Sequence, residues 1–188
     1  AIGCNLPKNL LDLDNTVEKN ISLLADAKNT TPNNLTACLL KRDRHKTIIE
    51  SLNKMKVKIK FISDGDVSGV MYVVDESSPV DIYLGIGGGP EGVLAASALS
   101  CLGGQIQTRL VLDKDQIIKA KLLGIKDLKK KYNIDEIIRG DTIFCASGIT
   151  DGDLLRGIVD KGDTFEASTY VLHKNSKTNI KVTNVHKK

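Results

Sequence analysis

The segment that most constrains the fold is residues 81–92, where a short apolar run gives way to closely spaced glycines and then to Pro90. Glycine has no Cβ, so a glycine-rich turn can bring backbone N–H groups close to a ligand. Proline is favoured in the first turn of a helix, and the positive end of that helix would point at the same ligand. The segment therefore predicts a strand, a phosphate-binding turn and a helix. Glu91, in the first helical turn, would repel a phosphate unless a cation lay between them.

Apolar periodicity predicts alternating strands and helices through most of the chain. Helices are predicted at residues 16–28, 44–55, 66–74, 90–102, 114–123, 127–132 and 154–159, and strands at residues 35–40, 57–62, 80–86, 105–112 and 142–147. Two alternating runs, residues 165–173 and 180–186, predict a β-hairpin. This order predicts one α/β domain over residues 1–188, with three α/β/α layers, a largely parallel or mixed sheet and a C-terminal β-hairpin.

Composition argues against several classes of partner. Of the 188 residues, 41% are hydrophobic and 4% aromatic, so the chain can bury an aliphatic core. The 27 basic and 23 acidic residues are too balanced for a nucleic-acid surface. No run approaches the ~18 apolar residues of a membrane span and no signal-peptide pattern is present, so we expect no membrane partner and a cytoplasmic location. The four cysteines are scattered without a CxxC pair, which indicates reduced thiols.

Ligands of α/β sheets bind where strands end and helices begin, and the joints at these places are unusually polar or glycine-rich here. The first joint carries Arg44 and His45 at a predicted helix start, where cations oppose the helix dipole unless an anion is bound. The other joints are residues 63–66, which include Asp64, Gly65 and Asp66, the glycine turn at residues 85–91, and residues 147–151. Together they predict a site for an anionic ligand.

Each joint also has a structural interpretation. Arg44 and His45 could be surface residues, Asp64 and Asp66 could be helix caps, and residues 147–151 could form a tight turn. The glycine turn matches only half of the dinucleotide-binding fingerprint, because Pro90 replaces its third glycine. A nucleotide-dependent enzyme would also need a ribose-binding acid after the strand at residues 105–112, where Asp113 is the only candidate. The basic run at residues 129–131 is typical of a solvated face.

The joints resemble, in order and spacing, the C-terminal half of class II fructose-1,6-bisphosphatases. The resemblance rests on Arg44-His45, on Asp64-Gly65-Asp66, and on the segments at residues 83–93 and 147–155, and it covers nearly the whole chain. It implies a metal-dependent sugar phosphatase that hydrolyses the 1-phosphate of fructose 1,6-bisphosphate in gluconeogenesis. Some members of that family also accept sedoheptulose 1,7-bisphosphate. The implied cofactor is a divalent metal, Mn²⁺ or Mg²⁺.

The resemblance also implies roles for single residues. Glu91 matches a metal ligand and Gly88 matches a backbone contact to the substrate. The remaining matches are substrate-binding positions, and they are Arg44, His45, Asp64, Gly65 and Asp66. Lys46 departs from the family, which usually carries an acidic residue there, and is not assigned to the site. No catalytic residue beyond the metal ligand is assigned in this chain.

The family's other metal-binding motifs, Gly-Glu-Gly-Glu and Asp-Pro-x-Glu-Gly-Thr, have no counterpart in this sequence. We therefore expect residues 1–188 to be the C-terminal portion of a longer phosphatase, supplying the substrate-side wall of the active site and inactive alone. The expected partners are a sugar bisphosphate and further copies of the chain. The alternative is a non-catalytic sugar-phosphate-binding module, which would use the same turn and Arg44 without metal.

Overall fold

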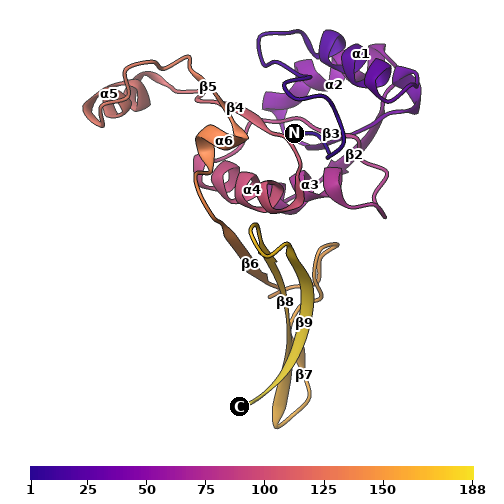
Figure 1. The fold of residues 1–188 in the computed structure, drawn as a ribbon, viewed down its shortest axis with the longest axis vertical. Coiled ribbons are helices and arrows are strands. Elements are labelled where there is room, and N and C mark those ends of the chain that lie inside the picture. The colour runs from indigo at the N-terminus through magenta and orange to yellow at the C-terminus, as the bar shows by residue number, and fades with distance from the viewer.

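A three-stranded parallel sheet organises the first half of the chain in the computed structural model, which describes residues 1–188. Its order is β2–β1–β3, with β1 at Thr36–Leu40, β2 at Lys58–Ile62 and β3 at Ile82–Tyr83 (Figure 1). β3 is shorter than the predicted strand at residues 80–86. The chain leaves the sheet there and enters the glycine turn, so the turn lies directly at the end of a central element.

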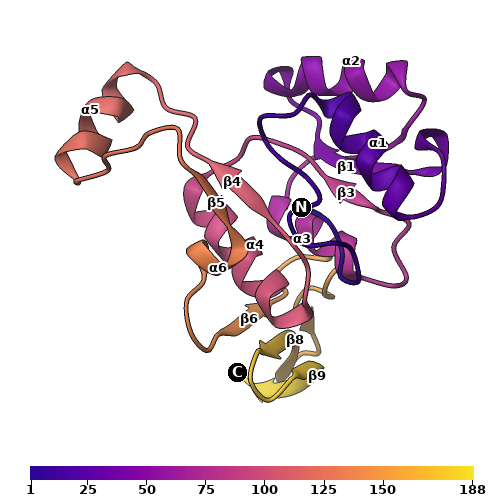
Figure 2. The ribbon, with the colours of Figure 1, turned by 45° about the horizontal axis from the view of Figure 1, so that its top comes forward.

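Helices cover both faces of this sheet, which confirms the predicted α/β fold with three layers (Figures 1 and 2). α1 (Val17–Ala27) and α2 (Lys46–Lys54) lie on one face, while α3 (Asp66–Met71) and α4 (Gly89–Leu102) lie on the other. Side chains of β1 alternate between the layers: Ala37 and Leu39 pack with α1 and α2, and Cys38 packs with α3 and α4. Fully burying one such aliphatic side chain contributes about 1.5–3 kcal/mol.

Short 3₁₀ turns join these elements at three places. They are η1 at Pro32–Asn34, η2 at Asp43–His45, which leads directly into α2, and η3 at Tyr72–Val74, which extends α3. None of the helices combines the length and the apolar composition that a membrane crossing requires.

The packing of Cys38 leads to a first prediction. Its side chain is fully buried, and burial raises the pKa of the thiol to about 11. Because the thiolate is the reactive form, we expect iodoacetamide at mildly alkaline pH to label the exposed Cys4 and Cys145 while Cys38 stays unmodified until the chain unfolds. Peptide mass mapping measures this order. Equal labelling of Cys38 and Cys4 in the folded protein would contradict the packing.

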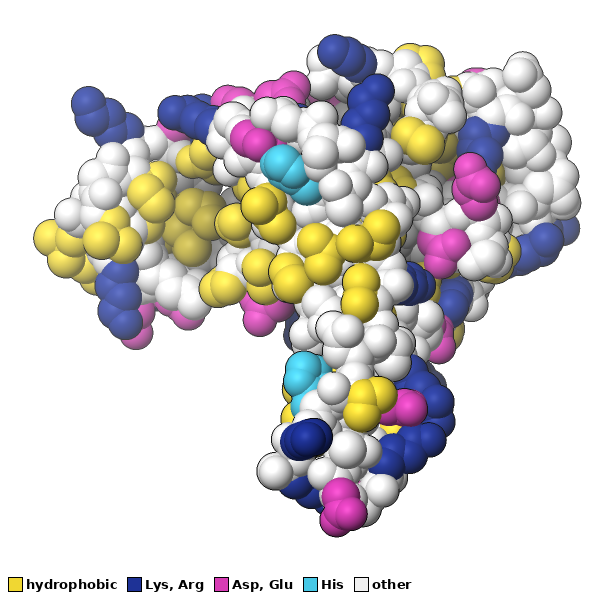
Figure 3. Space-filling model, turned by 60° about the horizontal axis from the view of Figure 1, so that its bottom comes forward, with side chains coloured by type: hydrophobic (Ala, Val, Ile, Leu, Met, Phe, Trp, Pro, Cys, Tyr) yellow, Lys and Arg dark blue, Asp and Glu magenta, His cyan; other side chains and the backbone are white.

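An arm built on β4 and β5 extends from the body and carries α5 (Figure 1). β4 (Gln107–Arg109) pairs antiparallel with β5 (Lys131–Asn133), in a two-stranded sheet separate from the parallel one. α5 (Lys114–Leu122) begins with a capping box between Asp113 and Gln116. The arm exposes apolar side chains, gathered at the left of the space-filling view in Figure 3: Val111, Ile118, Leu122 and Leu123 are 59–81% exposed.

The predicted helix at residues 127–132 is wrong, because Lys131 belongs to β5. Its ammonium group contacts the carboxylates of Asp12 and Asp14, each at 2.6 Å, and these long-range ion pairs add to the pairing of β5 with β4. A capping box from Asn133 then starts the short helix α6 at Ile134–Ile137. Two lysines of the basic run therefore form ion pairs, since Lys130 also pairs with Glu136 at 2.9 Å. The interpretation as a purely solvated face was incomplete.

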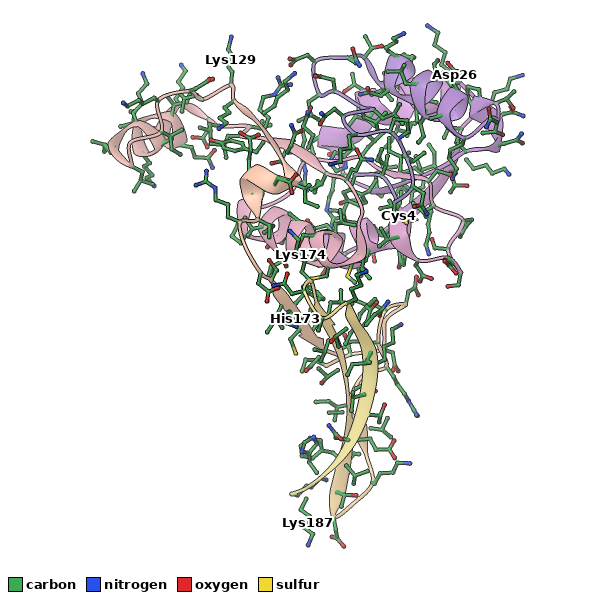
Figure 4. The ribbon with its side chains drawn as sticks, in the orientation of Figure 1. Cys4, Asp26, Lys129, His173, Lys174 and Lys187 are labelled. Atoms are coloured by element: carbon green, nitrogen blue, oxygen red, sulfur yellow. The ribbon has the colours of Figure 1, made fainter.

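The last part of the chain forms a separate antiparallel sheet. The predicted hairpin is confirmed as β8 (Thr164–His173) and β9 (Thr178–Lys187), while β6 (Ile143–Ser147) and β7 (Val159–Asp160) also pair with β8. Figure 4 shows His173 and Lys174 at the hairpin end nearest α4, and Lys187 at the far end. The imidazole of His173 contacts the Asp141 carboxylate at 2.7 Å, which links β8 to the segment before β6.

The predicted helix at residues 154–159 is also wrong. Residues 148–157 form a compact loop instead, in which the amide of Gly157 donates to the Asp151 carboxylate at 2.9 Å. A Cβ on Gly157 would lie 2.6 Å from the Thr150 carbonyl carbon, and one on Gly148 would overlap the carbonyl oxygen of Arg156. Glycine at these two positions therefore lets backbone segments of the loop approach each other closely, which the predicted helix would not require.

Candidate functional site

The carboxyl ends of the parallel strands meet at one edge of the sheet, and each end is followed by a predicted joint. Residues 41–45 follow β1, residues 63–66 follow β2 and residues 84–91 follow β3. The structure therefore brings together all seven predicted site residues, which are Arg44, His45, Asp64, Gly65, Asp66, Gly88 and Glu91.

The fourth predicted joint, residues 147–151, is not part of this edge, because it follows β6 of the antiparallel sheet. Its neighbour Asp153 instead ties the loop to the main body. The Tyr72 hydroxyl donates to the Asp153 carboxylate at 2.6 Å and Lys60 lies 3.3 Å from the same oxygen. The hydrogen bond from Tyr72, and then that from Lys60, lower the pKa of Asp153. These contacts favour the structural interpretation of this joint.

Two arginines after β1 bridge the three strand ends. Arg42 donates from Nη2 to the Ser63 carbonyl oxygen at 2.6 Å, which links the ends of β1 and β2. Arg44 donates from Nε to the Ile86 carbonyl oxygen at 2.7 Å, which links the ends of β1 and β3. The exposed Arg44 makes no other hydrogen bond, so both of its Nη groups are available to an anion. A guanidinium suits a phosphate because it can bind two oxygens at once.

His45 is oriented differently from Arg44. Its side chain is 0% exposed, and its Nδ1 lies 2.7 Å from the Leu40 carbonyl oxygen. Its Nε2 accepts a hydrogen bond from the Ile86 amide at 2.8 Å. Both ring nitrogens are therefore engaged by backbone groups, and a direct substrate contact would require one of these bonds to break.

The turn after β2 places two carboxylates at the same edge. Gly65 has φ +76°, a left-handed conformation that favours glycine, and its amide donates to Asp64 Oδ1 at 2.8 Å. Asp66 is the first residue of α3, and the N-cap position is occupied by Gly65. The carboxylate instead faces the glycine turn, since a Cβ on Gly87 would lie 2.7 Å from Asp66 Oδ2. The helix-cap interpretation of Asp66 is therefore not favoured.

The glycine turn presents unpaired backbone N–H groups beside an unpaired carboxylate. The amides of Gly87, Gly88 and Gly89 donate to no protein atom, and α4 begins at Gly89 with Pro90 in its first turn. Glu91 is exposed, and its carboxylate folds back over Gly88, so closely that a Cβ on Gly88 would overlap Glu91 Oε2. No cation pairs with this carboxylate, which leaves it free to bind a metal ion.

The chain does not contain a complete metal site. No group of three or more His, Cys, Asp or Glu side chains is arranged to hold an ion. The Glu91 carboxylate nevertheless lies over the bare turn, and carboxylate oxygens are the ligands that Mg²⁺ and Mn²⁺ prefer. The donor chemistry therefore fits part of a divalent-metal site.

Sequence reasoning missed three contributors to this edge. Ile86 contributes through its peptide group, which no side-chain pattern could reveal, and Arg42 binds a backbone carbonyl group. Tyr83 ends β3, and its ring packs against Gly69 and Gly85. Burial and then the nearby charge of Asp66 raise the pKa of Tyr83, so its phenol stays protonated at neutral pH.

A cavity of about 490 Å³ lies elsewhere, between the N-terminal segment that includes Cys4 and residues 73–81. Its charged lining is mainly acidic, with Asp75, Glu76 and Asp81, and its one lysine, Lys28, is paired with Asp81. Such a lining repels phosphate. The strand-end edge is the better candidate for an anionic ligand.

Comparison with known proteins gives consistent matches. The family described as "Bacterial fructose-1,6-bisphosphatase, glpX-encoded" matches residues 1–186. A "Fructose-1,6-bisphosphatase class 2" from Haemophilus influenzae is 32% identical over 99% of this chain and 60% of its own length. A "D-fructose 1,6-bisphosphatase class 2/sedoheptulose 1,7-bisphosphatase" from a Synechococcus species is 32% identical over 96% of this chain and 56% of its own length. The chain thus spans less than two thirds of these relatives.

Proposed function

The chain belongs to the class II fructose-1,6-bisphosphatase family, and we propose that it forms the substrate-side wall of an enzyme that hydrolyses the 1-phosphate of fructose 1,6-bisphosphate. The observation that carries this proposal is the free carboxylate of Glu91 folded over a turn whose amides also lack partners. A phosphate and a metal ion can both be bound there, because donors for the one lie beside a ligand for the other.

Different residues of this edge bind the phosphate, the sugar and the metal ion. The Nη groups of Arg44 and the amides of residues 87–89 donate to phosphate oxygens. Asp64 and Asp66 accept hydrogen bonds from sugar hydroxyl groups. Glu91 holds a divalent ion, Mn²⁺ or Mg²⁺, which when bound neutralises phosphoryl charge and lowers the pKa of water.

Glu91 alone does not suffice for a two-metal phosphatase, and no group of three or more His, Cys, Asp or Glu side chains surrounds it. We propose that the remaining ligands belong to a portion of the complete protein that this chain does not contain, consistent with the greater length of its relatives. Residues 1–188 alone should then release no phosphate. The free cysteines suit a cytoplasmic protein, and the exposed apolar side chains of the α5 arm suit a homo-oligomer.

The experiment is a phosphate-release assay on the complete protein with fructose 1,6-bisphosphate. We expect turnover with Mg²⁺ or Mn²⁺, none after chelation, and recovery when metal is restored. Sedoheptulose 1,7-bisphosphate should be assayed in parallel, since the Synechococcus relative carries both activities in its name. Tight sugar-phosphate binding that is independent of metal, without turnover, would favour a non-catalytic binding module instead.

Arg44→Lys in the complete protein is expected to raise KM about tenfold, equivalent to about 1.4 kcal/mol, with a smaller effect on kcat. Lysine keeps the charge but loses the planar fork that binds two phosphate oxygens. It also loses the Nε donor to the Ile86 carbonyl oxygen. Lys46→Arg, at the exposed neighbouring position, is the matched control. Unchanged steady-state kinetics for both Arg44→Lys and Arg44→Ala would remove this joint from the site.

A further inference from the structure

The backbone N–H and C=O groups of Ile86 both form hydrogen bonds with consecutive residues of the first joint. His45 Nε2 accepts from its amide at 2.8 Å, and Arg44 Nε donates to its carbonyl oxygen at 2.7 Å. Ile86 lies between Gly85 and Gly87, and it is the only residue at positions 85–89 with a side chain. Among residues 85–89, only the backbone of Ile86 forms hydrogen bonds with side chains, so these bonds hold the turn at this position.

The contacts of the His45 ring favour one tautomer. The Ile86 amide can only donate, so its 2.8 Å bond needs a lone pair on Nε2, and this contact is shorter than the 3.3 Å between Nε2 and the Ile86 carbonyl oxygen. The Leu40 carbonyl oxygen, 2.7 Å from Nδ1, can only accept, so Nδ1 must carry the proton. In the Nδ1–H tautomer, the imidazole connects the end of β1 to the turn after β3. It is fully buried, with the position of an absent Cβ on Gly85 only 3.4 Å from its Cε1.

This connection matters because the turn is otherwise weakly constrained. Glycine has the largest backbone freedom of any residue, so a turn with glycine at positions 85, 87, 88 and 89 loses the most entropy when it becomes ordered. The amides of Gly87 to Gly89 have no protein acceptor to hold them. Their direction is set mainly by the Ile86 peptide at one end and by α4 at the other.

We propose that His45 is a positioning residue, which orders the glycine turn through the Ile86 amide and does not itself contact the substrate. The kinetic consequence of this proposal rests on the proposed function, whereas the ordering of the turn by His45 is independent of it. A displacement of bound groups by about 1 Å can cost about 100-fold in rate. Losing the Nε2 acceptor should therefore reduce turnover even though no group that touches the substrate has been removed.

Two substitutions distinguish the role of Nε2 from that of Nδ1. The amide oxygen of His45→Gln can replace Nε2 as the acceptor for Ile86, whereas the shorter side chain of His45→Asn reaches only the position of Nδ1. In the ¹⁵N-labelled chain we expect amide hydrogen exchange at Ile86 to be slow in wild type and His45→Gln, and at least ~10-fold faster in His45→Asn. In the complete enzyme we expect kcat to fall about 100-fold in His45→Asn and less than about fivefold in His45→Gln.

The ¹⁵N chemical shifts of the His45 imidazole in the wild-type protein test the proposal without any variant. They should show Nδ1 protonated and Nε2 unprotonated. An Nε2–H tautomer would overturn the proposal whether or not either variant folds. Equal loss of activity in the two variants, with the Ile86 amide still protected, would also overturn it and would indicate a direct substrate contact. An inactive wild-type protein with the expected exchange pattern would instead count against the proposed function alone.

Discussion

Glu91→Gln in the complete protein is expected to lower kcat at least ~100-fold, equivalent to about 2.7 kcal/mol of transition-state stabilisation. Glutamine keeps the shape of the side chain and removes its charge, so it weakens a metal ligand while leaving the turn intact. The amides of residues 87–89 bind an anion about equally in the ground and transition states, and such uniform binding lowers KM without raising kcat. Losing Glu91 should therefore appear mainly in kcat.

Steady-state phosphate release at several metal concentrations measures this effect. Glu50→Gln is the matched control, because Glu50 is exposed on α2 and forms no ion pair. The melting temperatures of both variants without metal should stay close to that of wild type. If Glu91→Gln retains full activity and the full response to metal, Glu91 is only a charge that complements the dipole of α4.

Gly88→Ala is the second substitution with a large expected effect. Gly88 has φ −71° and ψ 148°, a conformation that alanine adopts without strain. The added Cβ would nevertheless overlap Glu91 Oε2, so the carboxylate would have to move away from the turn. We expect kcat/KM to fall about 30- to 100-fold, about 2–2.7 kcal/mol, while thermal stability changes little.

Gly92→Ala provides the control for this substitution. A Cβ on Gly92 would meet nothing within 4 Å, and alanine is favoured over glycine by up to about 1 kcal/mol inside a helix. This variant should be active and equal to or more stable than wild type, which differential scanning calorimetry and the same kinetic assay would show. If Gly88→Ala is as active as Gly92→Ala, the Glu91 carboxylate does not act from the position it occupies over Gly88.

The sequence was sufficient to predict those parts of the fold that local patterns determine. The apolar strands β1 and β2 and the amphipathic helices α1 and α2 follow from periodicity, and the glycine turn follows from composition. Because parallel strands end at one edge, the order of these elements also predicts where the site residues meet. The seven predicted residues do share that edge.

Contacts between distant segments explain what sequence reasoning missed. β5 is extended because it pairs with β4, and Lys131 on this strand also pairs with Asp12 and Asp14, more than a hundred residues away along the chain. The loop at residues 148–157 depends on a close backbone approach at Gly148 and Gly157. The burial of His45 depends on the backbone groups of Leu40 and Ile86, which no residue pattern encodes. Side-chain types and element order therefore predicted which residues share the edge, but not the orientation of each side chain.

We expect the three strand ends of the parallel sheet to bind a sugar bisphosphate in the complete protein. Hydrogen–deuterium exchange of the complete protein, with and without fructose 1,6-bisphosphate and metal, tests it directly, because exchange is resolved along the chain. We expect slower exchange in peptides that cover residues 41–46, 63–67 and 85–92, and no change at residues 73–81, which line the acidic cavity. Protection confined to residues 73–81, with the strand ends unchanged, would show that the ligand binds at the acidic cavity and not at the strand ends.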